Sequence, residues 1–209
     1  MPQAAHLTPI LLLIGSSLAS AQYKAINPRV AKIVSEISDE RITATQKKLE
    51  TFGTRQLLSS QDDPNRGIGA ARKWIYEQFR SYSPRLEVSY DQYKVKKDES
   101  RASRIPSDVD LYNVVAVLPG TVNKEQRIII SAHYDTIVIE PPPAGAPPPE
   151  PGTPLKIRNP NMDAPGVTDD GSGTACVLEL ARVMSQYEFE KTLVFITFAG
   201  EEEGLVGSS

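Results

Sequence analysis

Three clusters of polar side chains hold most of the chemistry that this sequence could perform. Each cluster follows or precedes a run of apolar residues and combines types that bind divalent metals or move protons. One imidazole and several carboxylates form a set of nitrogen and oxygen ligands that favours zinc. Three consecutive glutamates after a buried strand repel one another, so we expect a cation beside them. The clusters are His133 with Asp135, Asp169 with Asp170, and Glu201 with Glu202 and Glu203.

The elements that must position these clusters are strands and a helix. The runs LYNVVAVLPG, QRIIISAHYD and TLVFITFAG are short and continuously apolar, which is typical of strands buried on both faces. The helix-like stretch SGTACVLELARVMSQY separates the second run from the third, and this order predicts parallel pairing. Ligands collect at the carboxyl ends of strands in open α/β sheets, so the clusters are expected at one edge. We predict an α/β fold, a three-layer α/β/α sandwich with a mostly parallel mixed sheet.

The amino-terminal part of the chain predicts helices and one strand. Apolar residues recur at helical spacing over residues 30–37, and Ser38 is expected to cap a second helix whose first turn is acidic. Residues 68–82 show another amphipathic helical pattern. Residues 86–90 alternate in polarity, as expected for a half-exposed strand.

Composition and local sequence set the organisation of the chain. The net charge of −3 does not suggest a nucleic-acid partner. Residues 1–21 contain a short apolar run and small residues that predict a secretory signal, hence a secreted or periplasmic protein without a membrane span after cleavage. Residues 22–109 are expected to hold the amino-terminal helices and first strand, and 110–209 the first part of the core. The proline-rich insertion at 140–154 cannot join the sheet.

The cysteine content limits covalent stabilisation. Cys176 is the single cysteine, so no intrachain disulfide can form. It lies within an apolar stretch, which predicts a buried role as a small apolar side chain.

Each polar cluster, taken alone, has a plainer interpretation. HYD can end a strand with a hydrogen-bonded histidine, DDGSG can be a turn with a helix N-cap, and EEEG can be a solvated first turn of a helix. The occurrence of all three in this order, each at the end of a strand or the start of a helix, favours one shared site.

The motifs SAHYD, GVTDDGSGTA and FAGEEEGLVGS resemble the successive motifs of the secreted bacterial double-zinc aminopeptidase family, zinc exopeptidases with an α/β/α sandwich. The resemblance covers about residues 110–209, and FGTR and RGIGAARKWI are similar to the amino-terminal part of bacterial members. It implies hydrolysis of the first residue from peptides with a free N-terminus. It also implies that His133 ligates one zinc, Asp169 bridges two zinc ions and Glu202 ligates the other.

The same resemblance implies roles for the remaining acids. The family pattern is two glutamates, one variable residue and then Gly-Leu, so Glu201 matches the general base that takes a proton from the attacking water. Glu203 matches the variable position and is expected to face solvent. Asp135 is expected to accept a hydrogen bond from the far ring nitrogen of His133.

Two later ligands of the family pattern have no counterpart in this sequence. No acidic residue or histidine follows Glu203, and the only other histidine is His6. Each zinc is therefore left with two protein ligands, where catalytic zinc normally has three. We expect an amino-terminal portion of an aminopeptidase, with a sheet incomplete at the C-terminus, unpaired edges and exposed apolar surface.

Two alternatives stay open. One is a single-zinc enzyme of the glutaminyl-cyclase type, and the other is a non-catalytic module that keeps the peptidase fold. The sequence also leaves open the oligomeric state and the activity of this chain on its own.

Overall fold

The computed structural model describes residues 27–97, 104–140, 144–148 and 159–209. The predicted signal at 1–21 lies outside the described residues, and so does most of the proline-rich insertion. The described parts of that insertion lie in no helix or strand. The elements follow in the order α1 (Pro28–Ser35), α2 (Asp39–Glu50), α3 (Gly67–Tyr82), β1 (Glu87–Val95), β2 (Val109–Leu118), β3 (Asn123–His133), α4 (Gly171–Met184) and β4 (Lys191–Phe198).

Local signals set the start of α2 as the sequence predicts. The Ser38 side chain accepts a hydrogen bond from the Arg41 amide at 3.2 Å, and Asp39 and Glu40 lie in the first turn. This arrangement satisfies a free amide and places negative charge at the positive end of the helix dipole.

None of the helices in the described ranges is long and apolar enough to cross a bilayer.

The four strands form a mixed sheet in the order β1-β2-β4-β3. Strand β3 pairs with β4 in parallel, across the α4 connection, as predicted. The β1–β2 and β2–β4 pairs are antiparallel, so the expectation of a mostly parallel sheet is wrong for the described strands. For the β2–β4 pair, the physical reason is that only residues 119–122 join β2 to β3, which is too short for a crossover, so β3 and its parallel partner β4 run opposite to β2.

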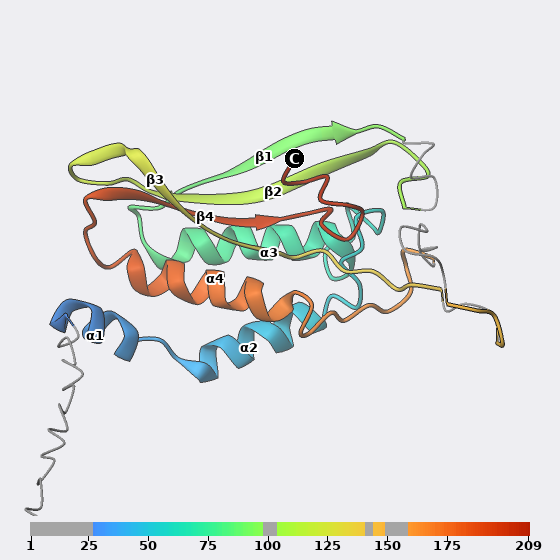
Figure 1. Cartoon of the computed structure of the whole chain (residues 1–209), viewed down its shortest axis with the longest axis horizontal. Coiled ribbons are helices and arrows are strands. Elements are labelled where there is room, and N and C mark those ends of the chain that lie inside the picture. The colour runs from blue at the N-terminus through green and yellow to red at the C-terminus, as the bar shows by residue number, and fades with distance from the viewer. Residues whose placement is uncertain (1–26, 98–103, 141–143, 149–158) are drawn as a thin grey trace, which may run out of the picture.

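All four described helices lie on one side of the sheet (Figure 1). Helix α3 packs against β1 and β2, α4 packs against β3 and β4, and α2 packs on α4. The described residues therefore build the sheet and one helical side of the predicted sandwich.

The edge strand β3 is less buried than its apolar sequence predicts. Ile128 and Ile129 are 47% and 61% exposed, so burial on both faces is wrong for this strand. The expectation of an exposed apolar edge is confirmed. Strand β4, which has neighbours on both sides, is buried over most of its length.

The core lies between the sheet and helices α3 and α4. Ile75 of α3, Leu178 of α4 and Phe195 of β4 are all fully buried there. Cys176 is exposed, so its predicted burial is wrong. The reason is helical periodicity, because the core-facing positions of α4 include residues 174, 178 and 181, and position 176 points away from them.

A matched pair of substitutions tests this placement of the core. Ile75→Val removes one methylene from a fully buried side chain and should lower the free energy of unfolding by about 1 kcal/mol. Ile129→Val makes the same change on the exposed edge and should have a smaller effect. Urea unfolding followed by circular dichroism measures both, and equal losses would contradict the described core.

Candidate metal centre

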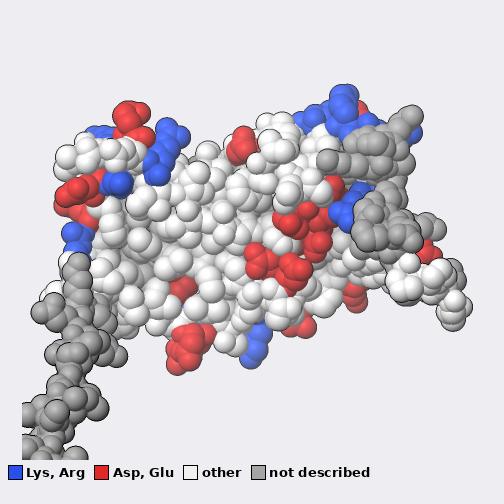
Figure 2. Space-filling view, in the orientation of Figure 1, with Lys and Arg blue, Asp and Glu red and all other residues white. Residues whose placement is uncertain are grey.

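The end of β3 brings His133 beside residues from the other two polar clusters. The His133 Nε2 atom lies 3.1 Å from Asp169 Oδ1 and 3.7 Å from Glu201 Oε2. Figure 2 shows a group of acidic side chains on the visible face near these strand ends. One imidazole therefore contacts carboxylates from two segments that are distant from it in sequence.

The other side of the imidazole faces Asp135. The Nδ1 atom lies 3.5 Å from Asp135 Oδ1, and neither atom has a hydrogen-bond partner in the structure. Asp135 is fully buried, and its Oδ2 accepts a hydrogen bond from the Glu202 amide at 3.0 Å. Asp135 therefore connects the end of β3 to the acidic segment and lies on the side of His133 that its predicted role requires.

Asp169 and Asp170 divide two roles between them. Asp169 is 78% exposed and faces His133, whereas Asp170 caps α4 by accepting a hydrogen bond from the Gly173 amide at 2.8 Å. The second oxygen of Asp170 accepts from the His133 amide at 3.3 Å. The peptide bond between the two aspartates is cis. The N-cap interpretation of this cluster therefore holds for Asp170, and the site interpretation remains for Asp169.

Alanine substitutions can separate these roles by their effect on stability. Asp170→Ala removes the N-cap and should lower the free energy of unfolding by about 1 kcal/mol. Asp169→Ala alters an exposed side chain and should change it by no more than about 0.5 kcal/mol. Urea unfolding of the two variants measures the difference, and the reverse order would contradict the assignment of the cap.

The acidic segment turns sharply after β4. Gly200 has a φ of +73°, which favours glycine, and the Leu205 amide donates to the Glu201 carbonyl at 2.8 Å. Glu203 is fully buried and accepts a hydrogen bond from Gln56 Nε2 at 2.9 Å. The expectation that Glu203 faces solvent is therefore wrong, because the turn directs it inward to an amide partner.

The site carries an excess of negative charge. Burial, followed by the charges of Asp135 and Asp169, raises the pKa of Glu202 to about 7. Burial and then Asp135 raise the pKa of Glu203 well above its ordinary value. For His133, burial opposes protonation, but the nearby carboxylate of Asp135, followed by the charges of Glu201 and Asp170, raises its pKa to about 9. These directions all indicate a site that would be stabilised by a cation.

The donor atoms present suit zinc in type and spacing. Two ligand atoms on a tetrahedral zinc lie about 3.3 Å apart, close to the observed 3.1 Å between His133 Nε2 and Asp169 Oδ1. The carboxylate of Glu202 lies close enough to both residues for their charges to alter its pKa. Within the described ranges, no group of three or more histidine, cysteine or acidic residues is arranged to hold a metal ion. His133 and Asp169 are the pair whose donor atoms have a spacing that fits zinc.

Two basic residues for which the sequence predicts no role, Arg55 and Arg104, support the segments that carry the site. Arg55 is fully buried and donates to the Tyr134 carbonyl at 2.6 Å, between His133 and Asp135. Arg104 donates to the Glu202 carbonyl at 2.8 Å. For Arg55, the only sequence signal was the similarity of FGTR to family members, which predicts no role for this arginine.

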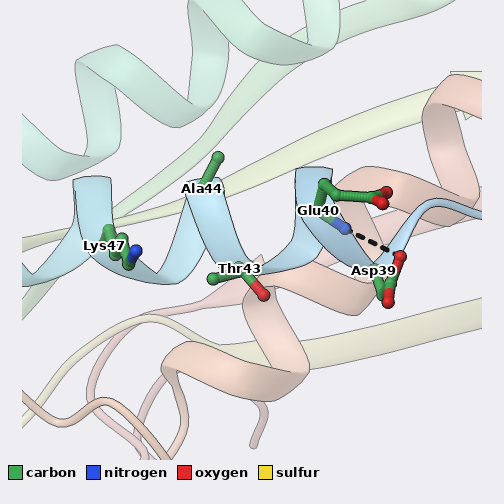
Figure 3. Close-up of a pocket in the computed structure, with 5 residues that line it drawn as sticks. All are labelled: Asp39, Glu40, Thr43, Ala44 and Lys47. Carbon is green, nitrogen blue, oxygen red and sulfur yellow. Dashed lines mark hydrogen bonds between the residues drawn. The ribbon is translucent and has the colours of Figure 1, made fainter.

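An open cavity of about 310 Å³ adjoins His133 and Glu201. Its other lining residues are Ser131, Ala132, Asp170, Phe198 and Ser208. A second hollow lies along α2, where the side chains all come from one helix (Figure 3). Its residues are Asp39, Glu40, Thr43, Ala44 and Lys47. The hollow along α2 combines no groups from different segments, so the cavity beside His133 is the stronger candidate for chemistry.

An imidazole and carboxylates at the carboxyl ends of two parallel strands define the candidate metal site of an α/β enzyme. Residues 113–209 match the model of peptidase family M28. The matched range includes every residue predicted for the site. The predicted zinc-peptidase family is therefore confirmed.

The chain is also similar to named proteins and solved structures. It is 37% identical over 206 residues to a probable zinc metalloprotease of Pyricularia oryzae, covering 97% of this chain and 36% of the relative. It is 26% identical to leucine aminopeptidase 1 of Ajellomyces capsulatus, covering 86% of this chain and 39% of the relative. LapB from Legionella pneumophila matches with a TM-score of 0.57 at 25% identity, covering 87% of this chain and 40% of that one. A glutaminyl cyclase from Fimbriiglobus ruber shares the fold, with a TM-score of 0.56 at 19% identity over 80% of this chain and 47% of that one.

The chain therefore spans less than half the length of each of these proteins. The activity and substrates of a whole relative are accordingly carried to this chain only as a proposal.

Proposed function

We propose that this protein carries a zinc-dependent aminopeptidase site that hydrolyses the first residue from peptides with a free N-terminus. The observation that supports it is the placement of His133 Nε2 between the carboxylates of Asp169 and Glu201, at 3.1 Å and 3.7 Å. The similarity to leucine aminopeptidase 1 favours an exopeptidase over an endopeptidase.

The residues have distinct roles in this proposal. His133, Asp169 and Glu202 would hold zinc, and Asp169 would be the ligand shared by two ions. Zinc, when bound, would polarise the scissile carbonyl and acidify the attacking water. Asp135 holds the His133 ring from its Nδ1 side, and Glu201 takes the proton of the attacking water and passes it to the leaving amine.

Hydrolysis of a leucyl anilide tests the proposal. The protein, loaded with zinc, should release the aniline, and a chelator should abolish release until zinc is restored. A matched leucyl anilide with an acetylated amine should not react, because a free N-terminus is required. Hydrolysis of the acetylated compound at the same rate would contradict the exopeptidase assignment.

The same assay separates the two alternatives. The glutaminyl-cyclase alternative rests on a solved structure that shares the fold, and it predicts cyclisation of a peptide with an N-terminal glutamine instead of leucyl hydrolysis. The non-catalytic alternative predicts no turnover of either substrate together with cooperative unfolding that does not depend on metal.

Export remains part of the proposal. Residues 1–21 carry the predicted signal, and cleavage should leave a mature chain that begins at Gln22. Mass spectrometry of the secreted protein measures the new terminus. A secreted product that begins at Met1 would contradict the signal assignment.

A further inference from the structure

The three segments that carry the candidate site share contacts with one short stretch between α2 and α3. These segments are residues 133–136 at the end of β3, residues 165–170 before α4, and residues 201–203 after β4. Arg55 and Gln56, two neighbouring residues, contact all three. Neither residue belongs to the set that would bind metal or move a proton.

Arg55 joins the first two segments. Its Nε donates to the Tyr134 carbonyl at 2.6 Å, and its terminal nitrogens donate to the carbonyls of Pro165 at 2.8 Å and Gly166 at 3.0 Å. The backbone of Arg55 also exchanges hydrogen bonds with Thr136, at 3.0 Å and 3.3 Å. The Gly166 carbonyl in turn accepts from the Gly171 amide at 3.0 Å, at the start of α4. One buried guanidinium therefore sets the spacing between the segment of His133 and the segment that leads to Asp169.

Gln56 extends this contact to the third segment. Its Nε2 donates to Glu203 Oε1 at 2.9 Å, and its Oε1 accepts from the Leu58 amide at 2.6 Å, which fixes the orientation of the side-chain amide. Gln56 and Glu203 are 1% and 0% exposed, so water does not compete for this bond. Glu203 directly follows Glu202, whose amide bonds to Asp135.

We infer that Arg55 and Gln56 are positioning residues, which together set the distance between the imidazole of His133 and the carboxylates of Asp169 and Glu201. They act through backbone carbonyls and through Glu203, without contact with the reacting atoms. Such supporting partners typically change metal affinity by about 10–100-fold when they are removed. The inference deepens the proposed function, since it concerns the same site.

The imidazole of His133 provides a direct readout. The chain holds two histidines, so a His6→Gln background leaves His133 as its single imidazole. Carbon and nitrogen NMR signals of the labelled ring are recorded at one fixed pH, without zinc. Because this readout needs neither metal nor substrate, failure of the proposed function leaves it intact.

The variants separate positioning from simple loss of stability. Arg55→Lys, Gln56→Leu and Glu203→Leu should each shift the His133 ring signals. Glu203→Gln keeps an oxygen that accepts the Gln56 amide and should retain the parent signals. Arg66→Lys is the matched control, because Arg66 also joins distant segments, through the Asn161 carbonyl and Asp163, but on the exposed surface.

Zinc titration by calorimetry gives the second readout. Affinity should fall about tenfold or more in Arg55→Lys and Gln56→Leu, and stay at the parent value in Arg66→Lys. Should Arg55→Lys not fold, the Gln56 and Glu203 variants decide the question. Folded Gln56→Leu and Glu203→Leu proteins with the parent His133 signals would overturn the inference.

Discussion

Replacement of Glu201 by glutamine is expected to abolish most turnover while zinc binding is retained. Positioned general bases contribute about 10²–10⁴-fold to rates, so the rate constant for leucyl anilide hydrolysis should fall by this factor. The amide of glutamine has nearly the shape of the carboxylate but cannot take a proton. In the parent protein, Glu201 Oε2 lies 3.7 Å from His133 Nε2. The substitution therefore removes a base that lies beside the candidate metal ligands.

The control is the same change at the opposite end of β4. Glu190→Gln removes an exposed carboxylate immediately before the strand and should leave the rate unchanged. Steady-state kinetics and zinc titration of both variants test the assignment. A Glu201→Gln protein that hydrolyses the anilide at the parent rate would exclude Glu201 as the base, and one that loses zinc would indicate a ligand instead.

Replacement of Arg55 by methionine is expected to cause the largest loss of stability. The guanidinium is fully buried, and burial lowers its pKa to about 10, although the charges of Asp135 and Asp170 oppose this. At neutral pH the side chain is still charged and donates to four carbonyl groups. Its removal leaves these carbonyls and the buried Asp135 without their positive partner, which should cost about 3–5 kcal/mol. The carbonyls belong to Leu49, Tyr134, Pro165 and Gly166.

Arg66→Met provides the comparison for this prediction. The Arg66 side chain is 41% exposed and pairs with Asp163, which is 77% exposed, so its loss should cost less than about 1 kcal/mol. Urea unfolding of both variants measures the two free energies. Equal losses would mean that the four carbonyl contacts of Arg55 contribute no more than one surface ion pair.

Local sequence patterns were sufficient to predict most of the helices and strands and to predict that the site residues lie close together. Ser38 with its acidic first turn marked the start of α2, because capping depends on residues within one helical turn. The contact of His133 with Asp169 followed from a more general rule. Both residues lie where a parallel β-α-β unit brings its loops together, at the carboxyl ends of the strands.

Features that depend on distant partners could not be read from local patterns. Glu203 was expected in solvent, but its amide partner Gln56 lies 147 positions earlier in the chain. The apolar residues next to Cys176 in the sequence led to the wrong prediction that it is buried. The helical period alone would have placed it away from the core. The roles of Arg55 depend on carbonyl groups, which carry no side-chain signal in any sequence.

The position of β3 at the sheet margin separates two kinds of stability in this molecule. Among the described strands β3 has a single neighbour, β4, and two of its isoleucines face solvent. Marginal strands open locally at a lower free energy than the interior strands of the same sheet. Local opening of β3 moves the imidazole of His133 away from Asp169 while β2 and β4 stay paired. The fraction of molecules with an assembled site is therefore set by this local equilibrium, and a high melting temperature alone does not report it.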